Sequence, residues 1–260
     1  MKIVVGNGAC VHAKAQLGDG VTVAAGAVIG EHVVIGPRTK IGTGAIIDGW
    51  TTLGADCDIH PYVVIGGPPQ HTVYKGERSY VEIGDRNILR EFVTIHRATG
   101  EDQKTVVGHD NFLMVGSHVA HNCRVGNQVT FANGTGLGGY VVVEDRVVIG
   151  GFAIIIQWMR IGTMAMVGVL SKGVKDIPPY VMADGNPLRV VGLNTVGLER
   201  GGVSHTSQQA LKEAYKIYYR SKLLSEEALQ KIEGEVPPCP EVSRFVEFIR
   251  APSKSGVYRG

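Results

Sequence analysis

Every sixth residue of this chain is aliphatic over long stretches, and this repeat restricts the fold more than any other feature. Starting at Val5, the residues at steps of six are Val, Leu or Ile at eleven successive positions, ending at Ile65. The next residue is frequently Gly, and the residue four positions after the aliphatic one is small or β-branched. Self-similarity at a fixed short period is typical of solenoid folds, so the repeat predicts stacked coils.

A period of six predicts very short strands separated by tight turns. Side chains alternate along a strand, so the aliphatic residue and the small residue four positions later both point inward. Three such strands close a triangular coil of about 18 residues, and stacked coils pair in parallel at about 4.8 Å. The pattern resumes at Ile83 and runs unbroken from Val107 to Val167. This predicts an all-β prism of about eight coils, roughly 40 Å long.

Two interruptions and one ending divide the repeat. The segments 66–80 and 97–105 break the phase and predict loops that leave the coil. Such insertions tend to mark a functional face in repeat proteins, and tolerated insertion is the alternative. The hexads end after Lys175. We therefore expect a parallel β-helix over 1–190, with loop insertions at 66–80 and 97–105, and a C-terminal helical domain over 191–260.

The C-terminal domain is predicted to be helical because its apolar residues recur at helical spacing. One apolar stripe consists of Leu211, Ala214, Tyr215, Tyr218 and Tyr219. Ser207 and Ser225 stand at the start of helical stretches and are the predicted N-caps. We expect these helices to pack on the prism or on a neighbouring subunit.

Composition and charge argue against several classes of protein. The formal net charge is +2, without the clustered basic face that predicts a nucleic-acid partner. No apolar stretch reaches about 18 residues, so we expect no membrane span. The N-terminus lacks the apolar core of a secretory signal, and the four Cys form no C-x-x-C pair. A cytoplasmic, reducing location is therefore expected.

The densest group of chemically active residues is the stretch NFLMVGSHVAHNCRVGN, which contains His118 and His121. Neither occupies an inward position of its hexad, so both should point out of the prism, and His96 lies about one coil earlier. Three interpretations compete: ordinary surface histidines, a metal site, and a general base. Neutral imidazole is a common metal ligand, and a pKa near 6.5 also suits proton transfer at neutral pH.

Four stretches resemble one family of hexapeptide-repeat enzymes. VEIGDRNILREFVTIHRAT, NFLMVGSHVAHNCRVGN, DIPPYVMADGNP and VGLNTVGLERGG, in this order, are similar to the UDP-N-acetylglucosamine O-acyltransferases, which catalyse the first step of lipid A biosynthesis. The resemblance covers nearly the whole chain. It implies a left-handed β-helix, although parallel crossovers are usually right-handed. It also implies a homotrimer with active sites in the clefts between prisms, an acyl carrier protein that delivers the acyl chain as a thioester, and neither a cofactor nor a metal.

The resemblance assigns roles to individual residues. His121 would be the general base that takes the proton from the 3-hydroxyl of the UDP-sugar as this oxygen attacks the thioester. The N–H of Gly139 would meet the oxyanion, and Gln70 in the first loop would contact the sugar nucleotide. Contacts to the acyl donor or the nucleotide are implied for His118, Gln157, Asn194 and Arg200. Arg200 is the natural partner of a phosphate, because its guanidinium carries a fork of donors.

The chain departs from its relatives around this same site. The family commonly has Asp where this chain has Asn122, and His where it has Tyr140 and Ile156; His71 replaces an acidic residue that meets the sugar. An Asp can stabilise the imidazolium, whereas Asn can only orient the ring. Either the substrate differs, for example a 3-amino sugar, or activity is reduced. Val169 stands where many members have Gly at the far end of the acyl groove, which predicts a shorter acyl chain than the longest the family uses.

Three alternatives to this enzyme remain open from the sequence. The first is an N-acyltransferase of the same architecture acting later in the pathway, although that relative normally carries an extra N-terminal domain and this chain begins directly with hexads. The second is a paralogue that binds acyl carrier protein or a nucleotide sugar without turnover. The third is a zinc hydratase of the hexapeptide-repeat class. The acyl chain length and the choice between a 3-hydroxyl and a 3-amino acceptor are left open as well.

Overall fold

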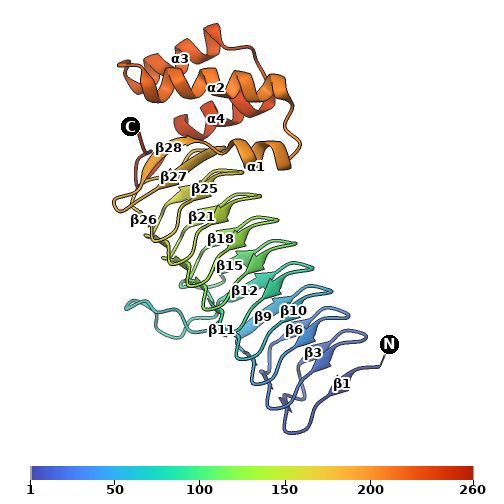
Figure 1. The fold of residues 1–260 in the computed structure, drawn as a ribbon. Coiled ribbons are helices and arrows are strands. Elements are labelled where there is room, and N and C mark those ends of the chain that lie inside the picture. Colours follow the sequence, from blue (N-terminus) through green and yellow to red (C-terminus); the bar gives the residue numbers. More distant parts are fainter. Residues whose placement is uncertain (1, 260) are drawn as a thin grey trace.

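The computed structural model describes residues 2–259, and most of them form a left-handed parallel β-helix with three sheets (Figure 1). Sheet A contains β1 (Val4–Val5), β4 (Thr22–Val23), β7 (Lys40–Ile41), β10 (Asp58–Ile59), β13 (Ile88–Leu89), β16 (Phe112–Leu113), β19 (Thr130–Phe131), β22 (Val148–Ile149), β25 (Met166–Val167), β27 (Val181–Asp184) and β28 (Arg189–Leu193). Sheet B contains β2 (Cys10–Val11), β5 (Val28–Ile29), β8 (Ile46–Ile47), β11 (Val64–Gly67), β14 (Thr94–His96), β17 (His118–Val119), β20 (Gly136–Leu137), β23 (Ile154–Ile155) and β26 (Lys172–Gly173). Sheet C contains β3 (Gln16–Leu17), β6 (Val34–Ile35), β9 (Trp50–Leu53), β12 (Tyr80–Ile83), β15 (Lys104–Val107), β18 (Arg124–Val125), β21 (Val142–Val143) and β24 (Arg160–Ile161).

Each coil takes one strand from each sheet, and equivalent residues of successive coils pair in register. Thr130 pairs with Val148, and Val148 with Met166, so coils without insertions advance by the 18 residues that three hexads supply. The predicted fold class is confirmed.

The aliphatic residue of each hexad fills the inside of the prism. Ile29, Ile41 and Ile65 are at most 2% exposed, and burying each such side chain contributes about 1.5–3 kcal/mol. Val5 obeys the same pattern but is 50% exposed, because it lies in the terminal coil, which has a neighbour on one side only. The repeat therefore builds one continuous core that is open at the N-terminal end.

The chain closes the other end of the prism with helices (Figure 1). Strand β28 turns back antiparallel to β27. The helices that follow are α1 (Thr195–Arg200), α2 (His205–Arg220), α3 (Ser225–Glu235) and α4 (Pro240–Arg250). The apolar stripe predicted for α2 faces inward, with Leu211, Ala214, Tyr215 and Tyr218 buried.

Both predicted N-caps are wrong. Ser204 caps α2, and its hydroxyl accepts a hydrogen bond from the Ser207 N–H, so Ser207 already lies inside the helix. Helix α3 begins at Ser225, and its N-cap is Leu224, whose N–H donates to the Glu227 carboxylate. Ser204 and Ser207 are both residue types that favour the N-cap of α2, and Ser204 is the N-cap because it precedes the first turn.

A buried ion pair joins the helices to the prism. The Asp176 side chain is fully buried and receives hydrogen bonds from both the N–H and the guanidinium of Arg160, each at 2.7 Å. The same guanidinium lies 4.5 Å from the ring centroid of Phe248 in α4 and donates to the Phe248 carbonyl at 3.2 Å. Arg160 thus ties the last coils of the prism to α4.

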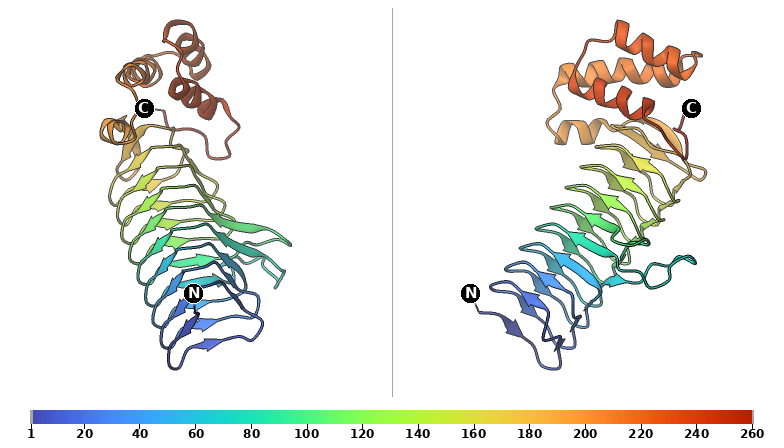
Figure 2. Two further views of the ribbon diagram at one scale, coloured as in Figure 1. Left: turned by 90° about the vertical axis from the view of Figure 1, so that its right-hand side faces the viewer. Right: turned by 180° about the vertical axis from the view of Figure 1, so that it is seen from behind.

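Two loops leave the coil at the same corner. Residues 68–79 connect β11 to β12, and residues 97–103 connect β14 to β15, so both loops emerge between sheet B and sheet C. Figure 2 shows them projecting from the side of the prism. Among residues 2–259, no helix has the length and apolar character that crossing a membrane requires.

Candidate functional site

His121 lies at the corner from which both loops emerge. It sits in the turn between β17 of sheet B and β18 of sheet C. The side chain is outside the prism core, as its hexad position predicts, yet the residue is only 3% exposed. Its cover comes from the first loop and from the next coil.

The imidazole of His121 is enclosed on several sides. A Cβ built on Gly139 would lie 2.4 Å from its Cε1 and 2.6 Å from its Nε2, so the ring packs directly on the backbone of the next coil. The rings of His71 and Tyr140 meet it edge to face, with centroids at 4.9 Å and 5.3 Å. The structure therefore brings four of the predicted site residues together.

Asn122 fixes which nitrogen of His121 carries the proton. Its Oδ1 accepts a hydrogen bond from the Thr99 N–H at 3.0 Å, and its Nδ2 donates to the Thr99 carbonyl at 3.1 Å. If the amide were rotated by 180°, its Nδ2 would face the Thr99 N–H and its Oδ1 would face the Thr99 carbonyl. Neither pair can form a hydrogen bond, so the orientation of the amide is determined. The same Oδ1 lies 2.9 Å from Nδ1 of His121. Nδ1 must therefore donate, and Nε2 keeps its lone pair.

The two loops hold each other and thereby hold Thr99. The Glu77 carboxylate accepts hydrogen bonds from the Thr99 hydroxyl at 3.0 Å and the Gly100 N–H at 2.9 Å. The bond from the Gly100 N–H, further backbone donors and the Thr99 hydroxyl lower the pKa of Glu77 to about 2. The Arg97 guanidinium donates to the Tyr74 hydroxyl at 2.6 Å. Sequence reasoning singled out the loops but missed Glu77 and Thr99, because hydrogen bonds between loops leave no periodic signal.

Burial sets the protonation of His121 and of its neighbour His118. Burial lowers the pKa of His121, the hydrogen bond to Asn122 raises it, and the nearby His71 lowers it. Burial also lowers the pKa of His118 to about 4, and its Nδ1 lies 2.7 Å from the Thr94 hydroxyl. Both rings are therefore neutral at pH 7, the state in which an imidazole accepts a proton.

Tyr140, one of the positions where the chain departs from its relatives, belongs to an aromatic ladder. Tyr140 stacks on Trp158 of the next coil at 3.8 Å between centroids, and the ammonium of Lys254 lies 3.3 Å from the Trp158 centroid. Gln157 and Ile156 precede Trp158 and are exposed. The stacked Tyr140 thus forms one wall of the His121 site, and Trp158 extends this wall towards the helical end of the prism.

Asn194 and Arg200 lie at a different corner of the same chain. Asn194 caps α1, with its amide accepting from the Gly197 N–H at 3.0 Å and donating to the Met164 carbonyl at 2.8 Å. Arg200 lines a groove of about 530 Å³ at the corner between sheets C and A, where Arg146 and Gln128 join it. The first loop and α1 lie on opposite sides of the prism in both figures. Within one chain, these residues are not brought to His121.

Gln70 and Val169 are exposed on either side of the site. Gln70 lies in the first loop, one residue before His71. Val169 is 62% exposed and sits in the turn between β25 and β26. Between this turn and the His121 corner runs the outer face of sheet B, where Ile154 is 50% exposed. No group of three or more His, Cys, Asp or Glu side chains is arranged to hold a metal within residues 2–259.

Two protein-family models match parts of the chain. The family described as "Udp N-acetylglucosamine O-acyltransferase; Domain 2" matches residues 176–258. The family described as "Bacterial transferase hexapeptide (six repeats)" matches residues 32–67. The two matches fall on the helical end and on the coils, respectively.

Curated relatives extend this similarity over most of the chain. The acyl-[acyl-carrier-protein]–UDP-N-acetylglucosamine O-acyltransferase of Thermodesulfovibrio yellowstonii is 44% identical over 205 residues, which span 78% of this chain and 79% of the relative. The enzyme of the same name from Synechocystis is 42% identical over 202 residues, spanning 78% of this chain and 73% of the relative.

Solved structures agree with the sequence comparisons. LpxA from Acinetobacter baumannii superposes with a TM-score of 0.94 at 36% identity, covering 98% of this chain and 100% of that one. The UDP-N-acetylglucosamine acyltransferase LpxA from Bacteroides fragilis gives a TM-score of 0.94 at 39% identity, covering 96% and 98%. The similarity therefore includes the prism, both loops and the C-terminal helices.

Proposed function

This chain belongs to the family of UDP-N-acetylglucosamine O-acyltransferases, and from this premise we propose that His121 is the general base with which it transfers an acyl chain from acyl carrier protein to UDP-N-acetylglucosamine. This reaction opens lipid A biosynthesis. The observation that carries the proposal is the fixed tautomer of His121. Asn122 holds Nδ1 as a donor, which leaves Nε2 as the proton acceptor.

The chemistry follows from this arrangement. Nε2 of His121 takes the proton of the sugar 3-hydroxyl while that oxygen attacks the thioester carbonyl. The C–S bond then breaks, and Nε2 returns the proton to the sulfur, so that the carrier leaves as the thiol. None of residues 2–259 accepts a hydrogen bond from the Gly139 N–H, so this donor is available for the oxyanion. Gly139 also allows the close approach, because a side chain there would overlap the His121 ring.

The acyl chain is proposed to run along the outer face of sheet B. Gly136 lies on this face, and the end of the Ile154 side chain packs over it, 3.0 Å from where a Cβ would lie. The exposed Ile154 and Ile156 supply apolar surface next to it. Val169, at the far edge of sheet B, would shorten the chain that fits. A preference for 14-carbon over 10- to 12-carbon donors would count against this role of Val169.

A homotrimer explains why the predicted site residues separate into two groups. His121, His118, Gln157 and Gln70 belong to the corner between sheets B and C, whereas Asn194 and Arg200 belong to the corner between sheets C and A. In a ring of three copies, one corner of each prism meets another corner of its neighbour. We propose that Arg200 of one subunit meets the nucleotide phosphates bound beside His121 of the next.

The ring of His71 bears on which atom of the sugar accepts the acyl chain. His71, in place of an acidic residue, lies edge to face with His121, and its Nδ1 accepts from the Val73 N–H at 3.3 Å. Its Nε2 is then a donor, so it would meet a sugar oxygen rather than an ammonium. This favours the 3-hydroxyl over a 3-amino acceptor.

The four cysteines are free, in agreement with a cytoplasmic location.

An acyl-transfer assay tests the reaction. It uses the purified chain, a series of acyl carrier protein thioesters, and both the 3-hydroxyl and the 3-amino sugar nucleotides. His121→Ala should lower kcat by about 10²–10⁴-fold, whereas the exposed His12→Ala should leave it unchanged. Equal rates for the wild type and His121→Ala would refute the assignment of the base. No turnover with any pair would favour the non-catalytic paralogue.

A mixing experiment tests the shared site. His121→Ala and Arg200→Ala subunits are each expected to be nearly inactive alone. Refolded together in equal amounts, they should recover about a quarter of the wild-type activity, because about one site in four then combines an intact His121 with a neighbour's intact Arg200. No recovery in verified mixed trimers would place both residues in the site of one subunit.

A further inference from the structure

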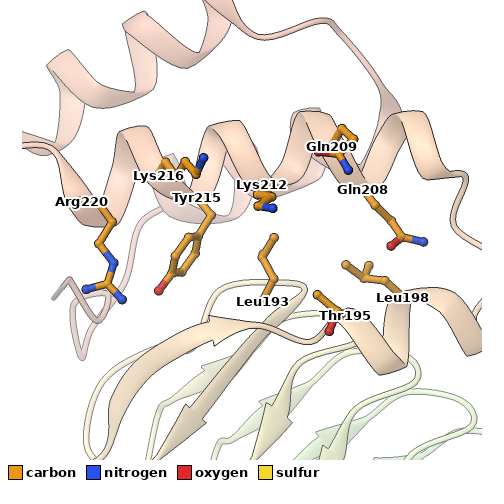
Figure 3. Close-up of a pocket in the computed structure, with 9 residues that line it drawn as sticks. All are labelled: Leu193, Thr195, Leu198, Gln208, Gln209, Lys212, Tyr215, Lys216 and Arg220. Atoms are coloured by element: carbon orange, nitrogen blue, oxygen red, sulfur yellow. The ribbon is translucent and has the colours of Figure 1, made fainter.

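A second groove lies between α2 and the end of the prism, and its lining includes none of the residues proposed for the reaction. Figure 3 shows helix α2 crossing above β28 and α1, with Leu193 and Leu198 below it. The groove has a volume of about 410 Å³, within the range of small-molecule sites. Its floor is apolar, formed by Leu193, Leu198 and the ring of Tyr215.

Three cations follow one edge of this groove. Lys212, Lys216 and Arg220 stand one helical turn apart on α2, so their side chains share one face of the helix. None of the three forms an ion pair with another residue in the range 2–259, and the groove lining includes no Asp or Glu. Positive charge beside an apolar floor is therefore left without a counter-charge.

Tyr215 supplies an independent sign that the groove takes a ligand. The residue is 8% exposed, and its hydroxyl is buried without a hydrogen-bond partner among the described residues. In Figure 3 its ring points from α2 towards the strands, beside Arg220, whose guanidinium lies 5.9 Å from the ring centroid. A buried hydroxyl without a partner is uncommon and destabilising. A polar group that enters the groove would satisfy it.

We propose that this groove is a second binding site, which takes a small anionic amphiphile. The apolar part lies on Leu193 and Leu198. The carboxylate or phosphate is held by the cations of α2 and accepts a hydrogen bond from the Tyr215 hydroxyl. A neutral lipid would leave the cations uncompensated, and inorganic phosphate would leave the floor uncovered. The buried, unpartnered Tyr215 hydroxyl distinguishes this site from the groove at Arg200, which also combines cations with apolar side chains.

Calorimetric titration of the full chain tests the site with four probes used below their critical micelle concentrations. Decyl phosphate and decanoate should bind, whereas decanol and inorganic phosphate should bind at least about tenfold more weakly, since each lacks one half of the ligand. The variant K212Q/K216Q should weaken decyl phosphate by about tenfold or more. The matched control K231Q removes a cation of the same domain outside the groove, and it should bind like the wild type.

The hydroxyl provides a readout that does not depend on charge. Tyr215→Phe removes the unpartnered group, so the unliganded variant should melt at the same temperature as the wild type or higher, while its stabilisation by decyl phosphate should shrink. If decyl phosphate binds equally to the wild type, to K212Q/K216Q and to Tyr215→Phe, it occupies the acyl groove at sheet B and the second site is refuted. Absence of binding to the wild type refutes it as well.

Discussion

At the scale of single residues, the amide of Asn122 decides how His121 titrates. Burial lowers the pKa of His121 below its ordinary value of about 6.5, and an amide adds no charge that would stabilise the imidazolium. A base must be neutral to accept a proton, so activity should be retained at neutral pH and fall only as the pH drops through this lowered pKa.

Asn122→Asp should therefore move the acid limb of kcat/KM to higher pH. A carboxylate 2.9 Å from Nδ1 favours the protonated ring, and the expected displacement is about one pH unit or more. The measurement is kcat/KM from pH 4.5 to about 8, the range over which imidazole titrates. An unchanged limb would mean that His121 is not the titrating base. Asn122→Ala, which leaves Nδ1 without its acceptor, should lower kcat without raising the limb.

Gly139 is predicted to tolerate no side chain. The Cβ of alanine would fall 2.4 Å from Cε1 of His121 and displace the ring, and a misplacement of about 1 Å can cost about 10²-fold in rate. Gly192→Ala is the matched control, because a Cβ there meets nothing within 4 Å. Both variants should melt within a few degrees of the wild type, so that a loss of activity confined to Gly139→Ala reports on the site.

At the scale of elements, the two loops act as one unit that holds Thr99 in place. Glu77→Gln replaces charge-assisted hydrogen bonds to Thr99 and Gly100 with weaker ones. It should lower kcat/KM by about tenfold, while the exposed Glu101→Gln in the second loop should have little effect. The coupling runs through Asn122, so combining Glu77→Gln with Asn122→Ala should cost little more than Asn122→Ala alone. Additive losses would show that Glu77 acts by another route.

The sequence predicts the coils far better than it predicts the site. Ile29 and Ile41 are buried because the six-residue period turns their side chains towards the inside of the prism, and this period can be recognised in a single sequence. The sequence does not predict helix α1, since the helix spans only Thr195–Arg200 and its N-cap, Asn194, is a residue to which the resemblance assigns a ligand contact. The Glu77–Thr99–Asn122 contacts join the two loops, which lie outside the repeat, to a turn residue inside it, so no spacing in the sequence indicates them.

At the scale of the whole molecule, Arg160 keeps the helices on the prism. Arg160→Ala would leave the fully buried Asp176 without its guanidinium partner, and breaking such a pair typically costs about 3–5 kcal/mol. Urea unfolding followed by circular dichroism would measure this loss. Arg124→Ala, on an exposed position of the same sheet, should change the free energy of unfolding by less than about 0.5 kcal/mol. Equal effects of the two variants would contradict a special role for Arg160.

The in-register stacking of coils also means that this molecule can change length only in whole steps. Residues 22–39 form one complete turn, and Thr22 and Lys40 occupy the same rung position in adjacent coils. After deletion of these 18 residues, β7 should take the position of β4 and pair with β1. The prism would be one coil shorter, and the His121 corner would be unchanged. Deleting 17 would rotate every earlier side chain out of phase, and that variant should not fold. Growth and shrinkage by whole turns, far from the reacting atoms, is thus a route by which such a chain can vary in size while its chemistry stays constant.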